Sequence, residues 1–336
     1  MNRCKKLGWV SFIFLVFFLL VSLPQAKSAD STATGNAPIM VASQEATIPL
    51  TANAVTGATE TDCPYKLTLK MGALFLYREG NNKNYHLFGV DSAPLEVRSH
   101  DLNLGWATGT DDSLMFQNKD FGVELRYFGA LGWSESKSGQ VNEGAAAPLI
   151  VGVSAKDKSW LNNGELNLHW WPCANDRYSL LMGVRFLRLN ERLTADEFIS
   201  SPEGSEAEAY SLTTVNQLWG GQVGAEGLLF GKRDQGFSLD GVVKVGMFHN
   251  AIHNKEHLAA FDDSVLVGTE GGSESRAKTT VLGELGLNAN YAFTKNIALT
   301  VGYEFLYLSA VAIIAQEYST QSVIYNGARA GLNITF

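Results

Sequence analysis

The sequence predicts an all-β protein, a transmembrane antiparallel up-and-down β-barrel of about ten strands. From residue 66 onward, stretches of the chain alternate between apolar residues on one face and polar or small residues on the other. Glycine is abundant at 33 residues, and proline is sparse at 8. Aromatic residues recur at the ends of the apolar faces, beside short polar connections. Together these features are typical of strands that cross a membrane.

The N-terminal part of the chain is predicted to hold a targeting signal and a linker, and no part of the folded domain. Residues 1–29 read as a signal peptide, because three basic residues precede a run of about 17 apolar residues, and small residues offer cleavage after Ser28 or Ala29. An uncleaved helix is the alternative, but that length is at the short limit for a span. Residues 30–62 are rich in Ser, Thr, Ala and Gly and predict a flexible lead-in. Residues 63–336 then form the barrel.

Ten segments share the two-residue period. One example places Leu180, Met182 and Val184 on one face, against Gly183 and Arg185 on the other. The predicted segments are 66–78, 100–106, 120–128, 164–170, 178–186, 219–227, 237–247, 281–291, 297–307 and 328–336.

The connections predict which end of the barrel faces which side. Short connections with good turn residues are expected at 172–176, 231–236 and 293–296, and a medium one at 109–119. Long loops are expected at 79–99, 134–158, 191–211 and 251–276. Short periplasmic turns and long external loops are the arrangement of outer-membrane barrels.

A soluble β-sandwich or lipocalin-like barrel would show the same alternation, with its apolar residues turned inward. The aromatic residues beside the short turns favour an apolar face in contact with lipid, as in an interfacial girdle. These residues are Trp170, Trp171, Tyr178, Phe230, Phe237, Tyr291 and Phe293. The alternation also reaches Phe336 in register, which resembles the signal that barrel assembly machinery reads. We therefore expect the outer membrane of a Gram-negative envelope, with its lipid and that machinery as partners.

The polar face is then expected to line the lumen. Its charged members are Lys70, Glu124, Arg126, Glu165, Arg185, Glu226, Asp240, Lys244, Glu284, Glu304 and Arg329. A ring of one sign would suggest ion selection. Mixed signs favour a paired structural network, because buried charges need partners. The sequence leaves two roles open: a porin for small solutes, or a structural component of the envelope.

Other functional classes have weaker support. The net charge of −8 argues against a nucleic-acid partner, and no cofactor motif is present. "HNKEH" places His253, Glu256 and His257 in the pattern of an inverted zinc protease, but that chemistry needs a helix. With the loop residues Asp262 and Asp263, this stretch keeps a ten-stranded outer-membrane protease, or a loop that binds a ligand or metal, as the alternative. The expectation is that the protein is not an enzyme and holds no metal.

Two cysteines remain after the signal peptide, Cys63 and Cys173. An exported chain permits a disulfide, and we expect both residues at the periplasmic mouth. A bond between them would narrow that mouth. Two free thiols, or pairing with another chain, are the alternatives.

Three stretches carry a family resemblance: "GVRFLRLNERL", "LWGGQVGAEGLLFGKRDQGFSLDGVVKVGMFHN" and "GLNANYAFTKNIALTVGYEFLYLSAVAIIAQ". They resemble the putative β-barrel porin family seven, outer-membrane proteins of planctomycete-type bacteria, over about residues 178–336. The resemblance implies an outer-membrane barrel. It implies no solute and assigns no functional residue.

Overall fold

A computed structural model describes residues 65–79, 86–90, 95–143, 149–172, 177–233, 235–314 and 320–336. The predicted signal peptide, the lead-in, Cys63 and Cys173 lie outside these residues. In the part described, no helix is long and apolar enough to cross a bilayer.

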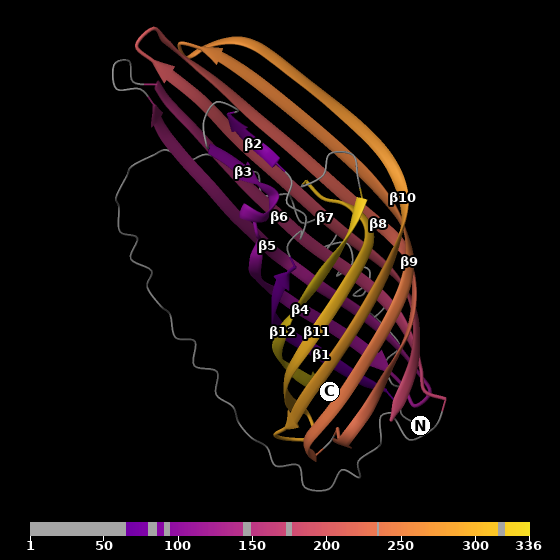
Figure 1. The fold of residues 1–336 in the computed structure, drawn as a ribbon. Helices are drawn as coiled ribbons and strands as arrows, with labels where there is room; N and C mark the ends of the chain where they lie inside the picture. The colour runs from indigo at the N-terminus through magenta and orange to yellow at the C-terminus, as the bar shows by residue number, and fades with distance from the viewer. Residues whose placement is uncertain are drawn as a thin grey trace, which may run out of the picture. The chain divides into compact units, whose positions relative to one another are not determined.

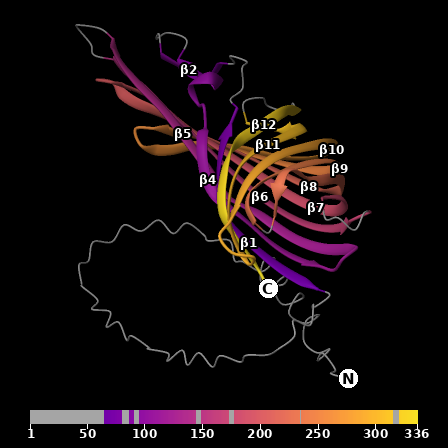
Figure 2. The same ribbon diagram turned by 90° about the horizontal axis from the view of Figure 1, so that it is seen from below.

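The described chain forms one closed barrel of ten antiparallel strands, in which each strand pairs with its neighbour in the chain (Figures 1 and 2). β1 and β12 close the ring, and the backbone N–H of Phe336 donates to the carbonyl of Leu67 at 2.8 Å. The barrel strands are β1 (Lys66–Arg78), β4 (Gly105–Gln117), β5 (Phe121–Glu143), β6 (Leu149–Trp170), β7 (Tyr178–Ser201), β8 (Gly204–Lys232), β9 (Gln235–Asp262), β10 (Val265–Ala292), β11 (Ile297–Ala312) and β12 (Thr320–Thr335). The predicted fold class is confirmed.

The second predicted segment, 100–106, is wrong. Residues Ser99–Asp101 form a short 3-10 helix, and the strand is β4, which begins at Gly105 and includes most of the expected connection 109–119. Leu102 and Leu104, expected on the lipid face, are both buried. The prediction failed because residues 100–106 alternate like a strand, whereas the outer face of the true strand, β4, is only partly apolar and was less easily recognised.

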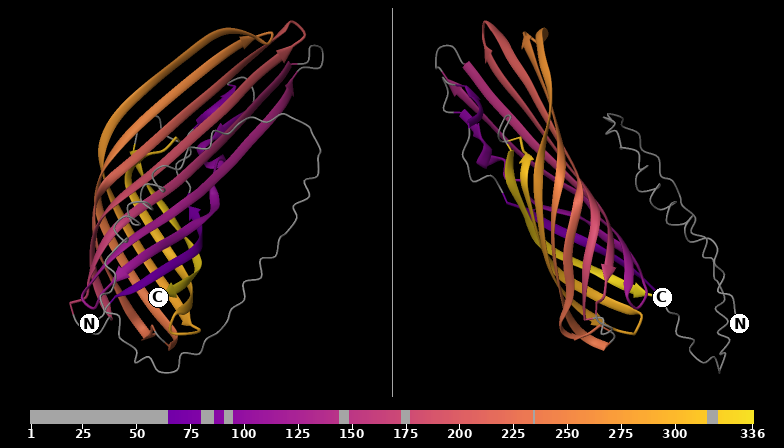
Figure 3. Two further views of the ribbon diagram at one scale, coloured as in Figure 1. Left: turned by 180° about the vertical axis from the view of Figure 1, so that it is seen from behind. Right: turned by 90° about the vertical axis from the view of Figure 1, so that its right-hand side faces the viewer.

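The expected long loops are also mostly wrong, because the strands continue through them. β8, β9 and β10 have 29, 28 and 28 residues, whereas about 9–11 tilted residues cross a bilayer. Asp263 and Ser264 form the tight turn between β9 and β10, and both have positive φ, 44° and 67°, as a type I′ hairpin turn requires. The longer strands run well past the ends of β11 and β12 (Figure 3). The connection between β1 and β4 carries a small hairpin, β2 (His86–Val90) with β3 (Leu95–Arg98).

The outer surface shows which part of the barrel lies in the membrane. Exposed aromatics ring the end with the short turns: Tyr65, Phe116, Phe121, Trp170, Tyr178, Phe230, Phe237, Tyr291, Phe293 and Phe336. A second group, Trp106, Trp160 and Trp219, lies exposed further along the strands. About ten tilted residues separate Trp170 from Trp160 on β6, which suits an apolar band about 25 Å tall. Beyond Trp160, the outward positions of β6 turn basic at Lys158 and Lys156.

Trp171 does not belong to the outer ring, contrary to expectation. It is only 7% exposed, and its ring stacks on that of His169 with centroids 5.8 Å apart. It therefore faces the lumen. The short turns lie at the same end as Phe336, which we call the periplasmic end by the usual arrangement of these barrels.

Candidate functional site

The lumen wall is built by one residue in two along each strand, because successive side chains point to opposite faces. The structure places all eleven charged residues predicted for the lumen on this inner wall. Most are almost fully buried, and Lys70, Glu226 and Arg329 line a cavity at the periplasmic end. Asp111 joins them on β4. It was missed because residues 109–119 read as a connection.

Glu284 on β10 is the centre of a buried ion network. Its carboxylate accepts from Arg126 at 2.5 Å and from Arg185 at 2.6 Å. The ammonium of Lys244 lies 3.2 Å away. The side chain of Glu284 is 0% exposed. A buried carboxylate is stable only with such partners.

Glu165 on β6 is a second centre, and Lys244 joins it to Glu284. Lys244 donates to Glu165 at 2.8 Å, and the Gln222 amide also donates to it at 2.8 Å. Asn167 and Asn163 each donate to it at 3.1 Å. Its lone pairs are therefore well satisfied.

The network is electrically balanced. Toward β12, Arg329 donates to Asp111 at 2.8 Å and to Glu304 at 3.3 Å. Arg126 also bonds Asp111 and Glu304, each at 2.8 Å. Four cations therefore meet four carboxylates: Arg126, Arg185, Lys244 and Arg329 with Asp111, Glu165, Glu284 and Glu304. Such a balanced set cross-links strands that are far apart around the ring.

Glycine makes room for this network at the inner wall. A Cβ at Gly302 would overlap with Asn288 Oδ1, which accepts from Arg329 Nε at 2.6 Å. A Cβ at Gly183 would likewise overlap with Asn167 Oδ1. The side chains can therefore lie flat against the backbone of the next strand.

Phe128 lies where the charged layer ends, on the side away from the periplasmic end, which we call the upper side. The guanidinium carbons of Arg126 and Arg185 lie 5.0 and 5.3 Å from the centre of its ring, within cation–π distance. Above Phe128 the inward residues become apolar.

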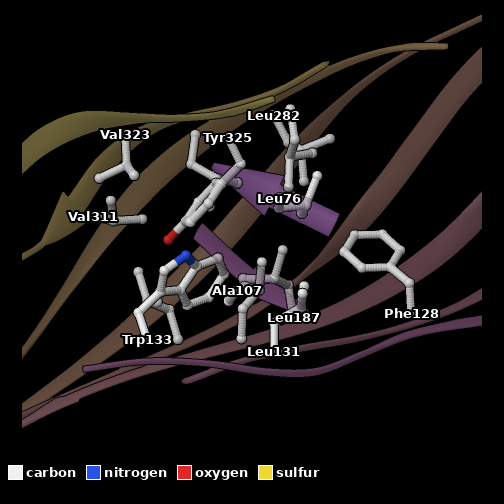
Figure 4. Packing of buried hydrophobic residues seen from close by; sticks show 14 of the residues in the cluster. Leu76, Ala107, Phe128, Leu131, Trp133, Leu187, Leu282, Val311, Val323 and Tyr325 are labelled. Atoms are coloured by element: carbon white, nitrogen blue, oxygen red, sulfur yellow. The ribbon is translucent and has the colours of Figure 1, made fainter. Parts of the chain in front are cut away.

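A buried apolar layer fills the lumen on the side of the ion network that faces away from the periplasmic end. It contains Leu74, Leu76, Phe128, Leu131, Trp133, Leu161, Leu187, Leu189, Leu218, Phe248, Leu282, Leu306, Leu308, Val323 and Tyr325, among others. Figure 4 shows these side chains converging from opposite walls, with Tyr325 beside Trp133. Their ring centroids are 5.4 Å apart, and Trp133 Nε1 donates to the carbonyl of Gly105 at 3.1 Å. Side chains that line a water-filled channel stay exposed, yet Leu187, Leu218 and Leu282 are each 0% exposed.

The sequence does indicate this layer, through an exchange of the apolar and polar faces along a strand, which the two-residue period alone does not reveal. On β7 the inward residue Arg185 is followed by outward Phe186 and inward Leu187, and then by outward Arg188. The apolar face therefore changes from outside to inside at Phe186. Beyond that point the inside is a core and the outside faces water, as in a soluble sheet.

Above the apolar layer, a smaller polar cluster lies beyond the membrane band. Arg78 pairs with Glu191 at 2.5 Å, and the Ile314 N–H donates to Glu191 at 2.9 Å. Burial, and then the nearby Glu191 carboxylate, raise the pKa of Asp157 to about 7, despite the opposing charge of Arg78.

The periplasmic end holds a cavity of about 630 Å³. It reaches from the turn residues Lys232 and Lys295 at the mouth inward to Arg126 and Lys244 of the ion network. Glu124 lies in its wall and contacts His169 Nε2 at 3.3 Å.

The "HNKEH" stretch lies on β9, not in a loop or a helix. His249, His253 and His257 share the exposed outer face, and His253 Nδ1 contacts Ser275 Oγ at 2.9 Å. Residues four apart on a strand are separated by about 13 Å, so they cannot share one metal ion. Asp263, in the turn between β9 and β10, instead accepts from the Ser205 N–H at the start of β8 at 2.8 Å. Within the described residues, no group of three or more His, Cys, Asp or Glu is arranged to hold a metal.

Comparison with known proteins supports the barrel and little beyond it. The profile of the family described as putative beta barrel porin-7 matches residues 150–322. No curated protein matches the sequence significantly. Among solved structures, the outer-membrane protease OmpT from Escherichia coli is 12% identical with a TM-score of 0.37, over 84% of this chain and 99% of that chain. Ail, the attachment invasion locus protein of Yersinia pestis, is 12% identical with a TM-score of 0.27, over 81% and 99%. The toluene transporter TodX of Pseudomonas putida is 7% identical with a TM-score of 0.26, over 81% and 89%. Scores this low transfer no function.

Proposed function

Since this chain belongs to the putative beta barrel porin-7 family of outer-membrane β-barrels, we propose that it is a closed, non-conducting member that acts as a structural component of the envelope. The sealed apolar layer in the lumen carries this proposal. An ion or small solute that crossed it would have to displace tightly packed Leu, Phe and Trp side chains.

The ion network below supports the same role. A conducting lumen keeps its charges hydrated so that ions can bind and leave. Here the carboxylates of Glu165 and Glu284 are 0% exposed and already neutralised by Arg185 and Lys244. These charges hold the wall together and leave no free site for a passing ion.

The long strands suggest what the barrel supports. β7 to β10 continue beyond the membrane band as a sheet that ends in tight hairpins. The barrel would anchor this sheet outside the cell. A porin for small solutes remains the second candidate, carried by the family name alone. A protease role has less support, because the β9 histidines are spread along a strand. We also propose that Phe336 is the contact for the barrel assembly machinery.

Conductance across a planar bilayer tests the proposal. Refolded wild-type protein should give no channel steps, although a heat-modifiable band on electrophoresis shows that it is folded. Phe128→Ala with Leu282→Ala, which opens the apolar layer, should give a leak if the double variant still shows the folded band. Stable, discrete steps from the wild type would overturn the closed-barrel proposal and favour a porin.

A further inference from the structure

The periplasmic cavity ends blindly, because its inner end meets the ion network and the apolar layer lies beyond. Its volume of about 630 Å³ is within the usual range for sites that bind small molecules. We propose that this cavity binds a small soluble polyanion bearing phosphate groups, taken from the periplasm. This goes beyond the structural role proposed above.

Basic side chains predominate in the cavity lining. Nine line it, against four acidic ones. The basic residues are Lys66, Lys70, Arg126, Arg177, Lys232, Arg233, Lys244, Lys295 and Arg329, and the acidic residues are Asp111, Glu124, Glu226 and Asp240. This excess is local, since the whole chain carries a net charge of −8.

Some of these cations are already neutralised. Arg126, Lys244 and Arg329 belong to the balanced network, in which each of them pairs with carboxylates. Arg233 pairs with Asp240 at 2.8 Å. Neither the ion network nor the Arg233–Asp240 pair includes the remaining lysines of the lining.

Four lysines are left facing the cavity. Among the residues that the structure describes, Lys66, Lys70, Lys232 and Lys295 form no ion pair. They come from β1, from the end of β8 and from the turn after β10, so they surround the mouth from different sides. Lys70 is deeper, on the inner face of β1 beside Gly72. Inside the cavity, the charge of Lys70 interacts with the carboxylates of Glu124 and Glu226. A ligand that enters would therefore meet the excess of positive charge mainly at the rim.

The chemistry of these side chains favours phosphate. An ammonium on a flexible stem is a point charge with three donors, and it binds phosphate without demanding a fixed planar geometry. Low-dielectric walls focus the positive field of such a cleft. The strands pair continuously around the ring, so a lipid cannot enter from the side. The aqueous mouth is therefore the route, and the ligand is soluble.

Inorganic triphosphate is a suitable probe for the refolded full-length protein in zwitterionic detergent. Isothermal titration should show saturable binding near one per chain, weakening as salt rises. The test variant carries Lys66→Gln, Lys70→Gln, Lys232→Gln and Lys295→Gln. The matched control carries the same change at four lysines outside the cavity: Lys137, Lys156, Lys158 and Lys255. Both must show the folded, heat-modifiable band. Lys70→Gln alone is a milder variant for use if the quadruple variant does not fold.

We expect the cavity variant to bind triphosphate at least about tenfold more weakly, and the control variant to stay within about twofold of the wild type. Absence of saturable binding by the wild type, or equal weakening in both variants, would overturn the proposal. If phosphatidylglycerol added to the micelles fully displaced triphosphate, the proposal that the ligand is soluble would be overturned. Conductance plays no part in this readout, so the closed-barrel proposal can fail without affecting it.

Discussion

Glu284 offers the sharpest test of the buried ion network. Glu284→Gln keeps the shape of the side chain and removes its charge. The four carboxylates of the network would then become three, against four cations, and a net positive charge would remain buried near Arg126, Arg185 and Lys244.

The expected cost follows from what each cation retains. Removing one partner of a buried ion pair costs about 3–5 kcal/mol. Arg126 keeps Asp111 and Glu304, Lys244 keeps Glu165 at 2.8 Å, and Arg185 keeps Glu165 at 3.5 Å. We therefore expect the lower end of that range, about 3 kcal/mol in the free energy of unfolding.

Urea unfolding in lipid vesicles, followed by tryptophan fluorescence, measures this cost. Lys137→Gln is the control, because it breaks an exposed pair with Asp101 in which Lys137 is 51% exposed, and such pairs contribute about 0–1 kcal/mol. Adding Lys244→Met to Glu284→Gln restores the balance of charge. The double variant should be less destabilised than the sum of the two single variants, by about 1–3 kcal/mol.

The reasoning fails if Glu284→Gln unfolds within about 1 kcal/mol of the wild type. It also fails if the two changes simply add. Either result would mean that the lumen charges are hydrated, and the case for a closed barrel would lose one of its two supports.

Three further predictions concern other parts of the barrel. Leu287→Arg should block folding into vesicles, because Leu287 is 46% exposed on the lipid face and Arg at the midplane costs about 2–4 kcal/mol; Leu287→Phe should fold normally, and equal folding of both would argue against the assigned face. Since the folded pKa of Asp157 is raised to about 7, its contribution to stability is fully present below about pH 4 and is lost as pH rises toward 7. Asp157→Asn should therefore melt higher than wild type at pH 8 and show little difference at pH 4, and a pH-independent difference would contradict this. Deleting Phe336 removes two backbone hydrogen bonds to Leu67 and the expected assembly contact, so outer-membrane levels should fall, whereas deletion of a residue in 30–62 should leave them unchanged.

The sequence by itself determined the fold class and the facing of most strands. A strand shows its two faces in the order of its own residues, so Lys70, Arg126 and Glu284 could be placed inside from alternation alone. The aromatic ring at the periplasmic end was also readable, except at Trp171. Trp171 was wrongly grouped with the outer aromatics, since alternation from the outward Trp170 places it inward, where the structure has it.

Only the tertiary structure decided which layers those faces build. Register between strands depends on pairing around the whole ring, and alternation is the same for every shift of two residues. Glu284 therefore meets Arg126 from a strand more than 150 positions away, which no local pattern encodes. The apolar layer arises in the same way, from Leu187, Leu282 and others brought to one level. The strand extensions were missed because, once outside the membrane, a strand no longer needs an apolar outer face, and its charged residues read as loops.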